Sequence, residues 1–151
     1  MLKPAAKSAT NDDEPDYRLE QQVGFLLRRA QQRHTAIFAA RIGRHQLTPT
    51  QFATLAKIFD EGTVSQNKLG RLTAMDPATM QGVIARLLDR GFLARTPDPE
   101  DRRRAILRLT DAGRAAFLDS APNGKTITKE TLAPLDAKER ATFLRLLSKL
   151  V

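Results

Sequence analysis

The feature that most constrains this chain is a series of helix-start signals that divides it into short segments. A side chain able to cap a helix N-terminus stands at each start: Thr48, Ser65, Asp76, Thr110 and Asp136. Two of these caps precede a proline, Pro49 and Pro77, whose missing N–H costs nothing at the first helical position. Glycines that favour helix ends follow the earlier segments, at Gly43, Gly62 and Gly91. The chain is therefore predicted to be mainly α-helical, in several helices.

Apolar spacing of three and four residues predicts where these helices bury a face. A long helix is expected over 17–42, with Val23, Leu27, Ala30, His34, Ile37, Phe38 and Ile42 on one stripe. Shorter helices follow from each cap up to Gly91. After Thr110 a further helix is expected to kink or break at 122–124 and to resume over 128–135, before a last helix that Asp136 caps with Glu139.

Residues 92–109 break the helical pattern. Phe92 to Arg95 and Ala105 to Leu109 predict two strands, and the polar stretch between them predicts a protruding β-hairpin. Residues 1–16 hold almost no large apolar side chain and predict a flexible tail. We expect residues 48–109 to form one functional unit, and residues 17–47 and 110–151 to form a helical region beside it.

The composition excludes several classes of function. The 151 residues contain no cysteine and only two histidines, so neither a disulfide nor a Cys/His zinc site is expected. No Gly-rich phosphate loop and no nucleophile–base signature appears, so we predict neither an enzyme nor a cofactor. No apolar run approaches a membrane span, and no signal-peptide block precedes Pro15, so cytoplasmic residence without a membrane partner is expected. The net charge of +8 favours a polyanionic partner.

Two short capped helices separated by the turn Thr73-Ala74-Met75 predict a helix-turn-helix, and the hairpin after it makes the unit winged. In this geometry the second helix enters the major groove of double-stranded DNA. Its predicted reading face is Ala78, Gln81, Gly82, Ala85 and Arg86, and the N-terminus of this helix is expected to bind a phosphate with help from Thr79. The opening of the first helix, Ser65, Gln66 and Asn67, is also expected on the phosphates. Gln81 suits adenine, and Arg86 suits guanine or a phosphate.

The hairpin loop holds three consecutive arginines, Arg102, Arg103 and Arg104, after Asp98, Glu100 and Asp101. A narrow minor groove concentrates negative potential and attracts arginine. We predict that Asp101 braces Arg103 for such a contact. A self-compensated surface hairpin that touches nothing is the alternative.

The stretch from Leu69 to Gly113 resembles the MarR family of winged helix-turn-helix regulators. The resemblance rests on MDPATM at 75–80, LLDRGFL at 87–93, RTPDPEDRR at 95–103 and LTDAG at 109–113. It implies a homodimer, mostly repressing, that binds a palindromic operator and places Asp101 and Arg103 at the wing tip. It also implies a dimer interface between terminal helices. The apolar stripe of Phe143, Leu146, Leu147 and Leu150 agrees with that interface, although this helix could instead pack on its own chain.

The segment 22–34 resembles a subgroup that controls catabolism of aromatic acids or their CoA thioesters. That resemblance implies an aromatic carboxylate or aryl-CoA effector, with candidate contacts at Arg28, Arg29, Arg33, His34, Phe38 and Phe52. The simpler interpretation is a core histidine, exposed arginines and core phenylalanines. For the whole chain, the leading hypothesis is a ligand-released repressor of a catabolic or efflux operon. The alternative is a winged-helix module that binds DNA without sequence preference, or binds protein.

Three features of the sequence, two single residues and one tripeptide, depart from the family pattern. Ala74 stands where the turn often carries glycine, and Gly82 lies inside a helix at a cost of roughly 1 kcal/mol relative to alanine. The Pro122-Asn123-Gly124 sequence is unusual within a long helix.

Overall fold

The computed structural model describes residues 17–151, so the predicted tail 1–16 lies outside the described residues. Within residues 17–151, a 3-10 helix (Leu19–Gln21) precedes six α-helices and three strands. Their order is α1 (Val23–Arg41), α2 (Pro49–Glu61), β1 (Thr63–Ser65), α3 (Gln66–Leu72), α4 (Pro77–Asp89), β2 (Leu93–Pro97), β3 (Ala105–Leu109), α5 (Asp111–Thr131) and α6 (Ala137–Leu147). The predicted fold class, mainly helical with a small hairpin wing, is confirmed.

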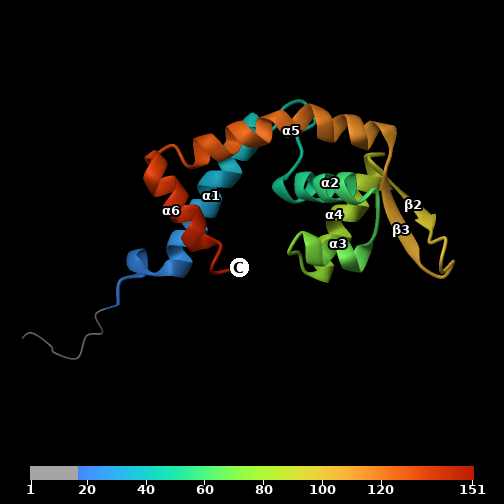
Figure 1. Ribbon diagram of the computed structural model, residues 1–151, viewed down its shortest axis with the longest axis horizontal. Helices are drawn as coiled ribbons and strands as arrows, with labels where there is room; N and C mark the ends of the chain where they lie inside the picture. Colours follow the sequence, from blue (N-terminus) through green and yellow to red (C-terminus); the bar gives the residue numbers. More distant parts are fainter. Residues whose placement is uncertain (1–16) are drawn as a thin grey trace, which may run out of the picture.

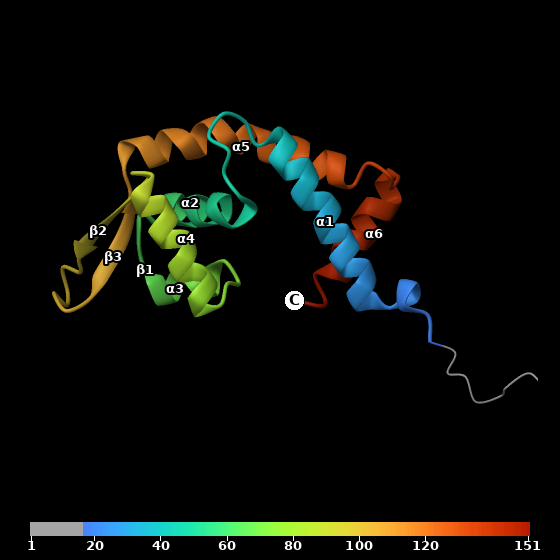
Figure 2. The ribbon, with the colours of Figure 1, turned by 180° about the vertical axis from the view of Figure 1, so that it is seen from behind.

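The elements form an arch (Figure 1). Helix α5 runs along the top of the arch. Helices α1 and α6 form one leg, below one end of α5, and α2, α3, α4 and the sheet form the other leg, below its other end. Figure 2 shows the hairpin of β2 and β3 projecting beyond the helices at the far end of this second group. The helix-turn-helix and its wing therefore lie at one end of the molecule, away from the terminal helices.

The predicted caps set the helix starts. Thr48 and Asp136 each form a complete capping box, with Gln51 and Glu139 respectively. The side chains of Ser65, Asp76 and Thr110 each accept a backbone N–H from the first turn of the following helix. Local sequence thus fixes where each of these helices begins.

The sheet has one strand more than the sequence predicts. The strand order is β1-β3-β2, and all pairs are antiparallel. In β1, Val64 is buried opposite Leu107 of β3, which attaches the wing to the start of α3. A three-residue strand carries too little alternation to predict, and its last residue, Ser65, is also the cap of α3.

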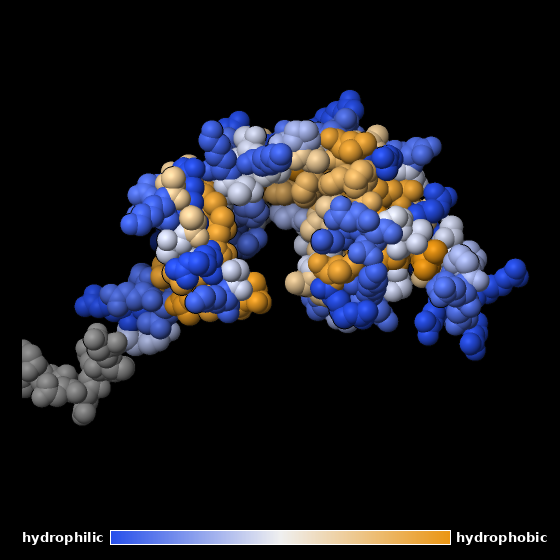
Figure 3. Space-filling model, viewed as in Figure 1, coloured by the Kyte–Doolittle hydropathy of each residue, from blue (hydrophilic) through white to orange (hydrophobic). Residues whose placement is uncertain are grey.

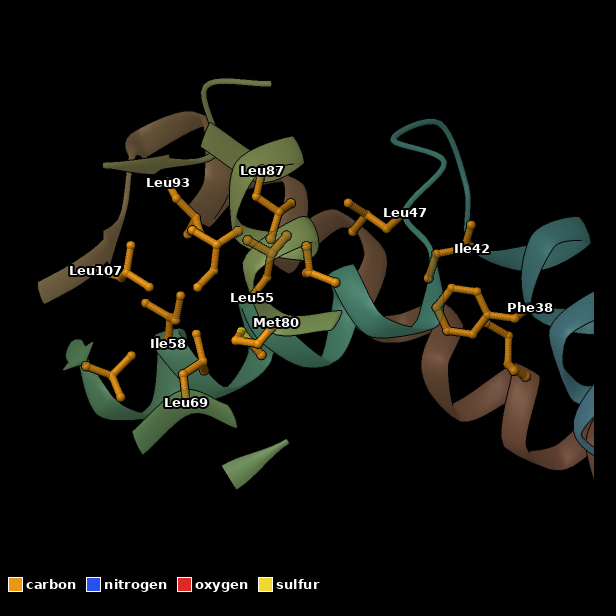
Figure 4. Close-up of a cluster of buried hydrophobic side chains, with 14 residues drawn as sticks. Phe38, Ile42, Leu47, Leu55, Ile58, Leu69, Met80, Leu87, Leu93 and Leu107 are labelled. Atoms are coloured by element: carbon orange, nitrogen blue, oxygen red, sulfur yellow. The ribbon is translucent and has the colours of Figure 1, made fainter. Parts of the chain in front are cut away.

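The core lies where α2, α3 and α4 meet the sheet and extends along α2 to the end of α1 (Figure 4). Leu55, Ile58, Leu69, Ile84 and Leu87 are fully buried there. Burial of these side chains at about 25 cal/mol per Å² stabilises the winged unit. Because Phe38 and Ile42 belong to the same cluster, the end of α1 is packed onto that unit.

Helix α5 is one continuous helix of 21 residues, so the predicted break at 122–124 is wrong. Pro122 is exposed, and its ring removes only one backbone N–H donor from the helix. The next two residues, Asn123 and Gly124, are half-buried and contact neighbouring elements. The Nδ2 atom of Asn123 donates to the carbonyl of Ile42 at 3.1 Å, and Gly124 lies against the Phe52 ring. These contacts outweigh the local cost of proline.

Helix α1 begins at Val23 instead of Tyr17, and the N-terminal half of its apolar stripe is not buried within the chain. Val23, Leu26, Leu27 and Ala30 instead line one wall of an apolar groove of about 520 Å³. Phe143, Leu146, Leu147 and Leu150 of the last segment line the other wall. Figure 3 shows this hydrophobic surface on the leg of the arch formed by α1 and α6. Among residues 17–151, no helix is long and apolar enough to cross a membrane.

Candidate DNA-binding interface

Helix α4 has one buried and one exposed face. Met80, Val83, Ile84 and Leu87 are buried in the core. On the other side Ala78, Thr79, Gln81, Ala85 and Arg86 are exposed, and Gly82 lies half-buried between them. A Cβ atom at Gly82 would meet nothing within 4 Å, so packing within the chain does not require glycine there. The predicted reading face is therefore free of the protein's own core, with small residues around Gln81.

The start of α4 is capped by an acid. Asp76 accepts the Thr79 backbone N–H at 2.9 Å through Oδ1 and the Thr79 hydroxyl at 2.6 Å through Oδ2. The hydrogen bond from the Thr79 side chain, and then that from its backbone, lower the pKa of Asp76. The first turn of α4 therefore already carries a carboxylate, and the Thr79 hydroxyl, which donates its proton to Asp76, can act only as an acceptor toward a further partner.

The opening of α3 faces the wing across a hollow. Ser65, Gln66, Asn67 and Arg71 line a space of about 600 Å³ together with Arg104 and Ala105 at the base of the wing loop. The structure thus brings the predicted phosphate contacts of α3 together with one wing arginine. Arg71 is a member that the sequence analysis missed, although it follows Asn67 at the four-residue spacing of one helix face.

Asp101 organises the wing tip. Its Oδ1 accepts the Arg103 backbone N–H at 3.1 Å and the Arg103 Nε–H at 3.2 Å, and its Oδ2 lies 3.5 Å from the Nε atom of Arg104. The Arg103 side chain is nevertheless 91% exposed. The predicted brace between Asp101 and Arg103 is therefore present, and it leaves the guanidinium projecting into solvent.

The candidate effector residues fall into separate places. Arg33 donates to the carbonyl of Glu130 at 3.0 Å, and the His34 Nδ1 atom lies 3.0 Å from the Thr131 hydroxyl, so both contact the end of α5. Phe38 is buried, and its ring packs at 6.0 Å from that of Phe52. In contrast, Arg28 and Arg29 are exposed on α1. These six residues do not converge on one cavity, and their role in ligand binding stays a prediction.

Comparison with known proteins fits this geometry. A model of the MarR family matches residues 47–105, which run from just before α2 through the wing loop. Over 152 aligned positions the chain is 42% identical to the HTH-type transcriptional repressor NicR of Pseudomonas putida, covering 100% of this chain and 96% of that protein. The chain belongs to the MarR family. This MarR-family protein is accordingly a DNA-binding transcription regulator and not an enzyme.

Two solved structures are similar to this MarR-family protein over most of its length. A probable transcriptional regulator from Pseudomonas aeruginosa is 46% identical with a TM-score of 0.85, covering 89% of this chain and 100% of that one. Bordetella bronchiseptica BpsR, whose DNA binding is regulated by 6-hydroxynicotinic acid, is 42% identical with a TM-score of 0.83, covering 89% and 96%. The whole arch, and not only the winged unit, is thus shared.

Proposed function

We propose that this MarR-family protein is a repressor that binds a palindromic operator as a homodimer and releases it when a small aromatic acid binds. The observation that carries the proposal is the exposed reading surface, in which the α4 face, the start of α3 and the arginine wing lie on one unit. The likeness to BpsR supports an aromatic acid as the effector. The regulated target that we propose is a catabolic or efflux operon.

The apolar groove between α1 and α6 supports the homodimer. Val23 and Leu150 are 65% and 69% exposed in the single chain, and α6 has no buried residue of its own. A helix with this much exposed apolar surface is stabilised by burial against another surface. A second copy offers the same two helices across a two-fold axis, so one interface would cover both grooves. Residues 17–47 and 110–151 are then the dimerisation region, and residues 48–109 the DNA-binding region.

Each part of the reading surface has a proposed partner on the duplex. Gln81 and Arg86 contact base edges in the major groove, and Ser65, Gln66 and Asn67 contact phosphates. Arg103 enters the minor groove with Asp101 behind it, and Arg102 and Arg104 contact the flanking backbone. The 2.6 Å bond that turns the Thr79 hydroxyl toward Asp76 leaves Thr79 suited to a base amino group.

A cleft between α1 and α2 is the proposed effector site. Thr35, Phe38, Ala39, Ile42, Gln46, Leu47, Thr48 and Pro49 line about 290 Å³, a size suited to a monocyclic acid. A shallower hollow that contains Arg28 shares Thr35 and Ala39 with this cleft. Arg28 is the cationic side chain among the residues that line this hollow, so we propose that its guanidinium attracts the carboxylate of the aromatic acid.

Paired arginine variants test the effector site. With 6-hydroxynicotinic acid as the probe, Arg28→Gln is expected to raise the concentration that releases operator DNA by roughly tenfold, the loss given by one charge-assisted hydrogen bond. Arg41→Gln removes the same charge further along α1, where the guanidinium pairs with the Glu130 carboxylate at 3.0 Å, and is expected to leave that concentration unchanged. Equal behaviour of the two variants would count against Arg28 as the anchor.

A mobility-shift titration tests the operator. The duplex upstream of the protein's own gene is compared with a scrambled duplex, with and without the acid. Operator recognition predicts a preference of at least about 1000-fold for the natural sequence. In addition, Gln81→Ala and Arg86→Ala are expected to lose discrimination at particular base pairs. A wild-type protein that binds both duplexes equally would favour the alternative, a winged-helix module without sequence preference.

A further inference from the structure

The loop between α1 and α2, residues 43–48, joins the two regions of the protein beside the middle of α5. Figures 1 and 2 both show this loop passing beside the middle of α5. Only this loop and the step from β3 into α5 connect the winged unit to the rest of the described chain. What holds the loop therefore contributes to how the winged unit is oriented, together with the packing of Phe52 and Phe59 of α2 on Phe117 of α5.

On one side the loop is bonded to α5. The His45 Nε2 atom lies 3.0 Å from Asp119 Oδ2, and the Arg44 guanidinium pairs with the same carboxylate oxygen. The hydrogen bond from His45, and then that from Arg44, lower the pKa of Asp119. One turn further on, Asn123 donates to the carbonyl of Ile42, the last residue before the loop.

On the other side the loop is bonded to the end of the recognition helix. Arg90, which directly follows α4, donates through Nη2 to the carbonyl of His45 and through Nη1 to Gln51 Oε1 at 3.3 Å. Its guanidinium also lies over the Phe92 ring, 4.6 Å from the centroid. The His45 ring meets the same phenylalanine at 6.0 Å. Arg90 thus links the loop, the cap of α2 and the start of the wing.

The loop backbone is held in a conformation that needs such support. Gln46 has φ +44°, which costs a non-glycine residue free energy. Gly43 has φ +95°, and a Cβ atom added there would lie 3.0 Å from the Asn123 side chain. Because strained residues persist only where their surroundings hold them, loss of the bonds around His45 would free the loop.

We propose that Arg90 and Asp119 are positioning residues that clamp the α1–α2 loop and so fix the two DNA-binding units of the dimer at the separation of two half-sites. The inference rests on the proposed binding of a palindrome by a homodimer. Arg90 stands at the end of α4 opposite the helix start that enters the groove, and its guanidinium is occupied within the protein. It therefore acts on operator binding through the loop and not by touching a base.

A clamp of this kind leaves a specific signature. When one unit binds one half-site, its orientation relative to its partner has no effect on affinity. When both units must reach major grooves about one helical turn apart, misorientation of either unit costs affinity. Loss of the clamp is thus expected to weaken binding to the full palindrome while sparing a single half-site.

The experiment measures affinity for the full operator and for a duplex of equal length whose second half-site is scrambled. Arg90→Ala is expected to weaken binding to the full operator roughly tenfold, the lower end for losing a hydrogen bond to a charged group, and to change half-site binding less than about twofold. Asp119→Asn should do the same from α5. Asp111→Asn, which removes the same charge from the exposed first turn of α5, is the matched control and should change neither affinity.

Three outcomes would overturn the proposal. The first is that Arg90→Ala and Asp119→Asn weaken binding to both duplexes equally, which would assign Arg90 and Asp119 a contact role or a purely structural role. The second is that both variants leave both affinities unchanged. A wild-type protein that does not distinguish the palindrome from its half-site would refute both the proposed operator binding and the clamp, and it is recognised before any variant is made. If Arg90→Ala unfolds at the assay temperature, Arg90→Lys and Asp119→Asn carry the same test.

Discussion

The turn of the helix-turn-helix gives the sharpest prediction about stability. Ala74 has φ +52°, the left-handed region that favours glycine. It ends α3 in a Schellman arrangement, in which Met75 N–H donates to the Gly70 carbonyl at 2.9 Å and Ala74 N–H donates to the Arg71 carbonyl at 3.4 Å. Both bonds are made by the backbone, so glycine at 74 would keep them.

The magnitude follows from two opposing terms. A left-handed conformation costs a non-glycine residue about 1–2 kcal/mol, and glycine returns roughly 0.5–1 kcal/mol of this through the entropy of its unfolded chain. Since Ala74 is exposed, its methyl group contributes little packing. Ala74→Gly is therefore expected to raise the free energy of unfolding by about 0.5–1 kcal/mol.

Urea unfolding followed by circular dichroism measures this difference. The protomer concentration is held fixed because a dimer's stability depends on it, and the midpoint should rise with an unchanged m-value. Ala115→Gly, at an exposed position inside α5, is the matched control and is expected to lose about 1 kcal/mol. If both variants were destabilised alike, the strain assigned to Ala74 would be refuted.

Three further predictions concern the wing, the core and acid stability. Arg103→Ala should weaken binding to many DNA sequences and reduce the slope of log K against log salt by up to about 0.9, because a guanidinium in the minor groove also displaces counterions from the phosphates beside it. An unchanged slope in filter-binding titrations would argue against the wing contact. Ser120 has a buried hydroxyl without a hydrogen-bond partner in the described chain, so Ser120→Ala should raise the free energy of unfolding by up to about 1 kcal/mol in urea, whereas a clear loss would reveal an unseen partner. Because hydrogen bonds from the loop imidazole and then the loop guanidinium lower the pKa of Asp119 below 3.8, its stabilising effect is present above that pH and is lost as the pH falls through the folded-state pKa. Asp119→Asn should accordingly flatten the acid limb of a pH-dependent unfolding curve, and an unaltered limb would contradict this.

Local signals predicted the helix starts well because capping is local chemistry. Thr48, Ser65 and Asp76 each need only the backbone N–H of the residue three positions later, and the sequence alone places both partners. The wing was predicted for the same reason, since Asp101 and Arg103 are close in the chain as well as in space. The DNA-facing side of α4 followed from helical period once its buried stripe was known.

Features that depend on distant residues were not predicted. Pro122 suggested a break, yet α5 continues because Asn123 and Gly124 contact α1 and α2. The stripe that begins at Val23 has the period of a core helix, but periodicity cannot distinguish a face buried in the same chain from one left for another surface. Arg90 gave no local signal either, since its partners lie 39 and 45 positions earlier.

The continuity of α5 places a limit on how this protein can change over evolution. At 1.5 Å per residue its 21 residues span about 31 Å, and one end carries the wing while the other carries the terminal helices. Inserting a single residue midway would turn everything beyond it by about 100° and advance it by about 1.5 Å. The length and helical rotation of α5 therefore fix how the wing and the terminal helices are placed relative to each other. Insertions are expected to be tolerated in the wing loop, where an added residue does not rotate another element.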